Sequence, residues 1–178
     1  MVKETRIRYL QDAADNKYLP WQYYDLNNIV SIPLVNKRPF LTEWTKFKKT
    51  VHPQYIDQNI GLLCGKVSDI TVVDVDINDG GLNLWNEISK NRRLNTPIVK
   101  SPSGGYHIYF KYNENIRSSN RLKINKERVG IDIRNNGTII VAPPSIIDGK
   151  SYKWVISMND ATIKRMPIWL ESFILNHT

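Results

Sequence analysis

The chain has 178 residues, of which 41% are hydrophobic and 24% charged, and its formal net charge is +8 at pH 7. This composition is that of a folded globular protein, and no apolar stretch approaches the length that spans a bilayer. The positive charge favours a polyanionic partner, nucleic acid before membrane. Cys64 is the one cysteine, which excludes an internal disulfide and a zinc site built on several cysteines. Without an apolar signal core near the N-terminus, we expect an intracellular, cytoplasmic protein.

The first half of the chain predicts a helix, three strands and two further helices. Helices are predicted over 4–18 and 53–57, and strands over 28–35, 60–64 and 69–77. Asp79-Gly80-Gly81 breaks the third strand, and apolar positions from Leu82 to Leu94 predict a helix after it. Strand, turn and helix in this order indicate a βαβ-like crossover.

The second half predicts more strands than helices. Strands are predicted over 96–100, 106–112, 129–134, 138–142 and 152–156, and a closing helix over 168–175. Ser103-Gly104-Gly105 predicts a hairpin between the first two strands, and Asn135-Asn136-Gly137 is typical of a type I′ hairpin turn between the next two. Because strands and helices do not alternate strictly, we expect one compact α+β domain over 1–178, with mixed or antiparallel sheets.

Two aspartates, Asp74 and Asp76, interrupt the β-branched run over 70–77. A strand has a side-chain period of two, so both carboxylates should project from one face. Aspartate is depleted in strands, and two like charges about 7 Å apart repel unless a cation lies between them. A divalent cation bound through oxygen ligands would meet that need. A solvated strand face is the alternative for an isolated pair.

Polar side chains also occupy one face of two other predicted strands. His107 and Tyr109 share a face of the strand predicted over 106–112, and Asp132 and Arg134 share a face of the strand predicted over 129–134. If the three strands are neighbours, three carboxylates and a histidine converge, enough to hold one or two magnesium or manganese ions. Histidine suits Mg²⁺ poorly, so we interpret His107 as a phosphate contact or proton donor, with a packed structural histidine as the alternative.

The turn before His107 has features that a triphosphate would need. Ser103 offers a hydroxyl donor, and Gly104 and Gly105 let the backbone approach closely, although such a turn can also be only a turn. The chain contains no G-x-x-x-x-G-K-[ST] run, which excludes a P-loop ATPase.

Basic residues are concentrated in two segments, and in the first of them aromatic residues lie among the basic ones. The first contains Lys37, Arg38, Lys46, Lys48 and Lys49, with Phe40, Trp44 and Phe47 among them, and the second contains Arg117, Arg121, Lys123, Lys126 and Arg128. Cations for phosphates and aromatic rings for bases suit a single strand of nucleic acid. A solubilising surface with core-facing aromatics is the alternative.

Several motifs occur in a fixed order along the chain. They are Ile32-Pro-Leu followed by Lys37, Pro39 and Trp44; Asn59-Ile-Gly-Leu-Leu-Cys-Gly65; Val-Val-Asp74-Val-Asp76; Ser103-Gly-Gly-Tyr-His107; and Gly130-Ile-Asp132-Ile-Arg134 through to Ser145. From about residue 32 to 154 this order resembles the prim-pol domain of the archaeo-eukaryotic primase superfamily, which occurs in plasmid, phage and viral replication proteins. The family often has Asp-x-Glu where this chain has Asp74-x-Asp76, a conservative departure.

The resemblance implies a fold and a function. The fold is an RRM-like catalytic module, about 69–178, packed against a smaller N-terminal α/β unit, about 1–68. The function is DNA-dependent primase and polymerase activity with a two-ion Mg²⁺ or Mn²⁺ site, acting on a single-stranded DNA template, a primer and NTP or dNTP substrates, with a helicase domain or subunit as a companion. The implied site residues are Asp74, Asp76 and Asp132 for metal, His107, Ser103 and Gly104 for the incoming phosphates, and Arg134 and Lys37 for further nucleotide contacts.

Two rival functions remain open at this point. One is a non-catalytic module that binds single-stranded nucleic acid, in which the acids are structural. The other is a metal-dependent nuclease, because three acids and a histidine also suit phosphodiester hydrolysis. The residues do not distinguish ribonucleotide from deoxyribonucleotide substrates.

Overall fold

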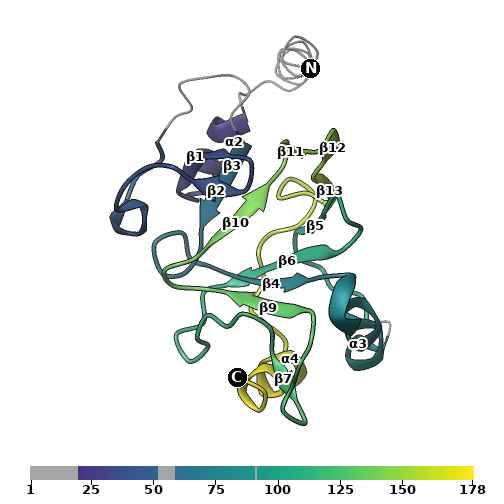
Figure 1. Cartoon of the computed structure of the whole chain (residues 1–178). Helices are drawn as coiled ribbons and strands as arrows, with labels where there is room; N and C mark the ends of the chain where they lie inside the picture. Colours follow the sequence, from purple (N-terminus) through teal and green to yellow (C-terminus); the bar gives the residue numbers. More distant parts are fainter. Residues whose placement is uncertain (1–19, 52–58, 91) are drawn as a thin grey trace.

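The computed structural model describes residues 20–51, 59–90 and 92–178. The helices predicted over 4–18 and 53–57 lie outside these residues. The described chain forms an antiparallel sheet of four strands, another of five, and two short two-stranded hairpins, with helices beside the sheets (Figure 1). It is therefore an α+β protein, as predicted. None of its described helices is long and apolar enough to cross a membrane.

The smaller sheet has the strand order β10-β3-β1-β2, with antiparallel neighbours throughout. Its strands are β1 (Ser31–Val35), β2 (Arg38–Pro39), β3 (Asn59–Leu63) and β10 (Ile139–Ala142), and helix α2 (Pro20–Leu26) precedes β1. All five residues of β3 are buried, which explains why its sequence from Ile60 onward contains no polar residue rather than alternating. The strands predicted over 28–35 and 60–64 are confirmed.

The larger sheet has the order β13-β5-β6-β4-β9 and is also antiparallel between neighbours. Its strands are β4 (Ile70–Val75), β5 (Ile98–Lys100), β6 (Tyr106–Lys111), β9 (Ile131–Arg134) and β13 (Lys153–Ile156). Because β4 and β5 are each antiparallel to β6, they are parallel to each other. The chain between them contains helix α3 (Gly81–Ser89), so the predicted βαβ-like crossover is confirmed.

The two faces of the larger sheet are buried in two different cores. On one face Val72 packs in a core with Leu62 of the smaller sheet. On the other face Val73 packs with Trp85 of α3 and Leu170 of α4 (Ile168–Leu175). Side chains of successive strand residues point to opposite faces, so alternate residues of β4 enter different cores. The closing helix is therefore confirmed, and it covers the face that α3 also covers.

The hairpin predicted around Asn135-Asn136-Gly137 is wrong. Its two strands exist, but β9 pairs with β4 and β10 pairs with β3, in different sheets. A type I′ turn needs positive φ at both central residues, whereas in this segment Gly137 alone has positive φ, at 77°. The Asn135 side chain donates hydrogen bonds to the carbonyls of Asn113 and Ile116, at 3.0 and 2.7 Å. These tertiary bonds override the local turn preference and carry the chain from one sheet to the other.

Two elements are shorter than predicted. β4 ends at Val75, because the Asp76 N–H donates to the Gly130 carbonyl and Ile77 takes helical dihedral angles before the 3₁₀ turn η2 (Asn78–Gly80). α3 ends at Ser89, because Lys90 adopts a left-handed conformation with φ of 47°. Asp76 therefore follows the strand that holds its companion acid rather than lying within it.

Short elements complete the described fold. The 3₁₀ turn η1 (Trp44–Lys46) lies in the first basic segment, β7 (Lys123–Ile124) pairs with β8 (Glu127–Arg128), and β11 (Ile146–Ile147) pairs with β12 (Lys150–Ser151). The predicted β5–β6 hairpin and the edge strand β13 are confirmed. β10 comes from the second half of the chain but belongs to the smaller sheet, and the division into two lobes near residue 68 stays a prediction.

Candidate active site

Asp74 lies at the centre of the site because β4 has a neighbour on each side. The strand register places His107 of β6 directly opposite Asp74, and Asp132 of β9 directly opposite it on the other edge. Directly opposite residues share a face, with Cβ atoms about 4.5–5.5 Å apart. The predicted convergence of polar side chains from three strands is therefore present, on the face that also carries Val72.

Arg134 is the positive charge between the two strand carboxylates. Its Nη2 atom lies 3.2 Å from Asp74 Oδ2 and also donates to Asp132 Oδ2. Its Nη1 atom donates to Asn120 Oδ1 at 3.1 Å, which holds the guanidinium from a third side. The other oxygen of Asp132 accepts a hydrogen bond of 2.6 Å from the backbone N–H of Arg121. The site thus contains its own internal cation.

Asp74 and Asp76 carry raised pKa values. Burial raises the pKa of Asp74, Arg134 counteracts this, and the charge of Asp132 adds to the increase. Burial also raises the pKa of Asp76, and the charges of Asp74 and Asp132 raise it further. Lys37, near the β1–β2 turn, is close enough for its charge to lower the pKa of Asp74. The acids repel one another, so additional positive charge would stabilise their ionised forms.

His107 is buried beside Asp74 and is neutral. Its Nε2 atom lies 3.4 Å from Asp74 Oδ1, and its ring centroid is 5.4 Å from that of Tyr152. Burial, followed by the charge of Arg134, lowers the pKa of His107 to about 3. Its Nδ1 atom is buried and has no hydrogen-bond partner of good geometry within the described part of the chain, although the backbone of Val141 lies near enough to raise the pKa of the imidazole. A buried polar atom without a close partner is costly, so this nitrogen is a candidate contact for a bound group.

The glycine turn approaches the end of β4 closely. A Cβ atom at Gly105 would lie 2.2 Å from the Val75 carbonyl oxygen, and one at Gly104, where φ is 102°, would lie 2.6 Å from Ile77 Cδ1. Only glycine permits this approach. The Ser103 hydroxyl lies 3.0 Å from that of Ser101. The turn therefore places the exposed Ser103 beside the strand end that Asp76 follows.

The acids have the chemistry of a magnesium or manganese site. Three carboxylates offer the hard oxygen ligands that these ions prefer, and the repulsion among them favours a bound cation. Within residues 20–51, 59–90 and 92–178, however, no three acidic, histidine or cysteine side chains are already arranged around one point for a metal. Arg134 holds Asp74 and Asp132 instead. The donor set fits a divalent cation, which would compete with the guanidinium.

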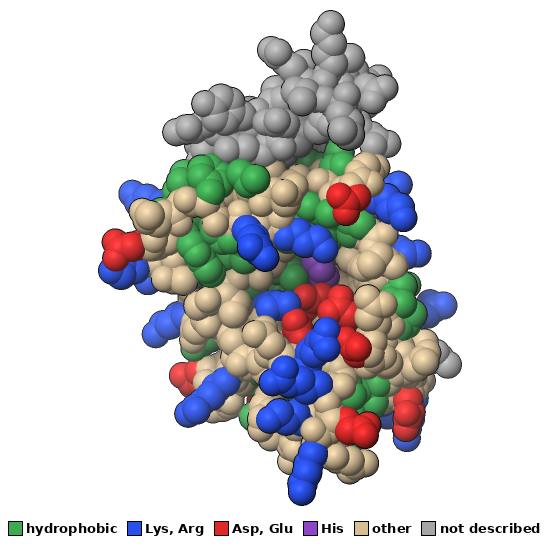
Figure 2. All heavy atoms as spheres, in the orientation of Figure 1, with side chains coloured by type: hydrophobic (Ala, Val, Ile, Leu, Met, Phe, Trp, Pro, Cys, Tyr) green, Lys and Arg blue, Asp and Glu red, His purple; other side chains and the backbone are tan. Residues whose placement is uncertain are grey.

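The predicted nucleic-acid contacts are only partly gathered by the fold. Trp44 and Lys48 line one cavity, whereas Lys46 pairs with Glu43 and Arg121 pairs with Asp79 at 2.7 Å. The remaining predicted contacts are exposed and do not line that cavity; they are Lys49, Arg117 and Lys123. Figure 2 shows acidic side chains gathered in a hollow of this face, next to a histidine, with Lys and Arg side chains around them.

Most residues of the cavity were not predicted to be functional, and three of these are polar residues that come from outside the first basic segment. Lys66, Asn136 and Thr138 line it together with Trp44 and Lys48. Asn136 was interpreted as a turn residue, and only the passage of the chain from β9 to β10 brings it to the end of β3. The isolated Lys66 carries no sequence signal that would have identified it.

A comparison with known protein families identifies one match. The family model described as bifunctional DNA primase/polymerase, N-terminal, matches residues 22–169, most of the chain and all of the strands described above. No curated protein matches the chain.

Proposed function

The chain belongs to the bifunctional DNA primase/polymerase N-terminal family, and on that premise we propose that it adds nucleotides to a 3′-hydroxyl on a single-stranded DNA template. One observation carries the proposal. Asp74 stands in register with both Asp132 and His107, and Arg134 pairs with both carboxylates. Phosphoryl transfer needs little covalent chemistry from the protein, so positioning and neutralisation of charge are the main tasks of such a site.

The chain's own residues would bind the incoming nucleotide. The Ser103 hydroxyl and Gly104 lie beside the end of β4. The hydroxyl can donate a hydrogen bond to a phosphate oxygen, and Gly104, whose N–H donates to the Ser101 carbonyl at 2.9 Å, lets the chain turn close to that end. His107 offers its unpartnered buried nitrogen, and Arg134 offers a guanidinium that already bridges two oxygen ligands. Lys37 adds positive charge near Asp74. Together these groups would orient a triphosphate relative to the acids.

A two-ion Mg²⁺ or Mn²⁺ site held by Asp74, Asp76 and Asp132 would supply the activation of the 3′-hydroxyl and the stabilisation of the leaving pyrophosphate. The support for this assignment is the oxygen donor set and the mutual repulsion that raises the pKa values of Asp74 and Asp76 after the effect of burial. The backbone N–H of Asp76 donates to the Gly130 carbonyl, and the residue is half-buried, so it remains partly accessible to solvent.

The proposal extends to the fold class and the biological setting. An antiparallel sheet with α3 and α4 on one face supports an RRM-like module of the archaeo-eukaryotic primase type. Replication or primer synthesis of a plasmid, phage or virus is the setting that we propose, with a single-stranded template, a primer and NTP or dNTP as partners. A helicase domain or subunit would supply the unwound template.

Primer extension tests the proposal directly. The protein is incubated with a primed template, Mg²⁺ or Mn²⁺, and either all four NTPs or all four dNTPs. We expect the primer to lengthen, and the two nucleotide sets reveal which sugar the site accepts. Shortening of the strands would instead identify a nuclease, and binding without any change of length would identify a non-catalytic module; both results would overturn the proposal.

Asp74→Asn is the variant that links the activity to the site. The amide keeps the shape of the side chain and leaves Arg134 paired with Asp132, so the fold should survive while extension is lost. Asp148→Asn is the matched control, because Asp148 is exposed in the β11–β12 turn and should not affect extension. Circular dichroism of both variants confirms that they are folded.

A further inference from the structure

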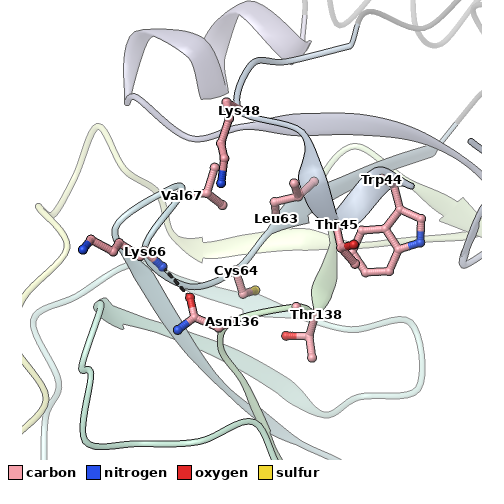
Figure 3. Close-up of a pocket in the computed structure, with 10 residues that line it drawn as sticks. Trp44, Thr45, Lys48, Leu63, Cys64, Lys66, Val67, Asn136 and Thr138 are labelled. Carbon is pink, nitrogen blue, oxygen red and sulfur yellow. Dashed lines mark hydrogen bonds between the residues drawn. The ribbon is translucent and has the colours of Figure 1, made fainter. Parts of the chain in front are cut away.

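A cavity of about 500 Å³ opens at the end of β3 (Figure 3). Three separate parts of the chain line it. The first basic segment contributes Trp44, Thr45 and Lys48, the end of β3 and the residues after it contribute Leu63, Cys64, Lys66 and Val67, and the link between β9 and β10 contributes Asn136, Gly137 and Thr138. Its volume lies within the range of about 300–1,000 Å³ that small-molecule sites occupy.

The cavity has an aromatic and apolar part and a cationic part. Figure 3 shows Trp44 and Lys66 on opposite sides of the cavity, with Cys64 and Asn136 between them and the Lys48 side chain directed toward Val67. Among the ion pairs of the described residues, none involves Lys48 or Lys66. The Lys66 side chain extends outward, away from Trp44, so its ammonium group lies at the rim of the cavity (Figure 3). A half-buried indole with an unneutralised lysine in the lining and another at the rim suits a group that has both a flat ring and a phosphate.

The polar walls of the cavity already have hydrogen-bond partners. Asn136 Oδ1 accepts from the Lys66 backbone N–H at 2.9 Å, and its Nδ2 atom donates to the Tyr112 hydroxyl at 3.0 Å. The Thr138 hydroxyl donates to the Asn135 carbonyl at 2.7 Å. These groups form a fixed wall rather than a set of free donors and acceptors. A base in this cavity would be held by stacking without having its edge read, so every base should be accepted.

The cavity lies close to the acids. Asn136 is two residues beyond Arg134, at most about 7 Å along an extended chain. The charges of Arg134 and Asp74 both act on the buried Cys64 thiol, whose pKa is raised chiefly by burial. A nucleotide unit in the cavity would therefore be adjacent to the place where we propose that bond formation occurs.

We propose that this cavity holds one nucleotide unit of the single-stranded template, with the base against Trp44 and the backbone phosphates at Lys48 and Lys66. The inference rests on the proposed function, and it adds a defined anchor for the strand. The anchor would fix the template relative to the acids without regard to its sequence, which is what a polymerase needs from a contact outside the templating position.

Strand binding without divalent cation or nucleotide tests the anchor separately from catalysis. Fluorescence anisotropy of a labelled oligothymidylate is measured for the parent and for Trp44→Leu, which keeps an apolar side chain against the core but removes the flat ring. We expect affinity to fall roughly 5- to 150-fold. Trp169→Leu is the matched control, since Trp169 is a half-buried tryptophan that packs on Trp85 in the other core, and its affinity should equal the parent's.

The two lysines are tested through the salt dependence. Lys48→Gln and Lys66→Gln should each lower the slope of log affinity against log salt by about 0.7, whereas Lys164→Gln, an exposed lysine elsewhere, should leave it unchanged. These exposed substitutions leave the core intact, so they test the cavity even if Trp44→Leu fails to fold. An abasic strand of equal length should bind the parent and Trp44→Leu alike, but should still respond to the lysine variants.

Two results would overturn the proposal. Unchanged affinity and salt slope in the cavity variants would show that the strand follows another path, even if the protein extends primers. A rise in KM for the free nucleotide without any loss of strand binding would assign the cavity to the incoming substrate. If the parent protein does not extend primers, but the cavity variants weaken strand binding as expected, the catalytic proposal is refuted and the anchor is not.

Discussion

Replacement of Arg134 by glutamine should destabilise the metal-free protein strongly. Arg134 is paired with Asp74 and Asp132, whose side chains are only 13% and 10% exposed. Removing one member of such a buried network leaves carboxylates that water can barely solvate, at a cost of about 3–5 kcal/mol. For a chain of this size, each kcal/mol corresponds to roughly 2–4 °C in Tm, so we expect a fall of about 6–20 °C.

Magnesium should restore part of the stability lost by Arg134→Gln. A divalent cation can then occupy the acids without displacing the guanidinium, and a ligand at a hundred times its Kd stabilises a protein by about 2.7 kcal/mol. Thermal unfolding followed by circular dichroism, with EDTA or with rising MgCl₂, measures both effects. Arg165→Gln is the control, because Arg165 is exposed and lines a different cavity, with Lys111 and Glu171, and makes no ion pair with Asp74 or Asp132. Equal magnesium responses of parent and Arg134→Gln would refute the idea that the guanidinium and the cation compete for the same carboxylates.

Three further outcomes are expected. His107→Gln should lower kcat/KM for nucleotide addition without changing metal-free strand binding, and an unchanged kcat/KM would return His107 to a structural role. Burial raises the pKa of the Cys64 thiol to about 12, whereas the thiol of the unfolded chain ionises near pH 9. The free energy of unfolding should therefore lose about 1.4 kcal/mol per pH unit above pH 9 through this residue, and nothing below it. Urea unfolding at several pH values should show a smaller loss of unfolding free energy above pH 9 in Cys64→Ala than in the parent. Gly105→Ala would place a Cβ atom 2.2 Å from a backbone oxygen, so both Tm and primer extension should fall, whereas Gly149→Ala, which meets nothing within 4 Å, should lose stability only through its positive φ and leave extension intact.

The elements of the described fold were predictable wherever a single periodicity governed a segment. The alternation around Asp74 predicted β4, and the apolar spacing from Ile168 to Leu175 predicted α4 within its observed bounds. Side-chain period alone also predicted that Asp132 and Arg134 share a face. These features depend on residues close in sequence, so they could be recognised before the partners of each strand were known.

Strand partners could not be predicted in the same way. The Asn136-Gly137 pair has the local preference of a hairpin turn, yet the buried Asn135 amide bonds to Asn113 and Ile116 and takes the chain into the other sheet. A local preference of this kind contributes about 1 kcal/mol at most, whereas leaving buried carbonyl and amide groups unbonded costs more. Only the tertiary structure decides which of these prevails.

The sequence by itself determined the residue types of the site. Its acids and its histidine lie in or next to strands that the side-chain period of two made recognisable, and its glycine turn lies between two such strands. The tertiary structure decided that Arg134 lies between the carboxylates and that Lys66 and Asn136 meet Trp44 around one cavity. The physical reason is that charge pairing and cavity formation depend on distances between residues far apart in the chain. Such distances follow from how the two sheets pack, which no local pattern encodes.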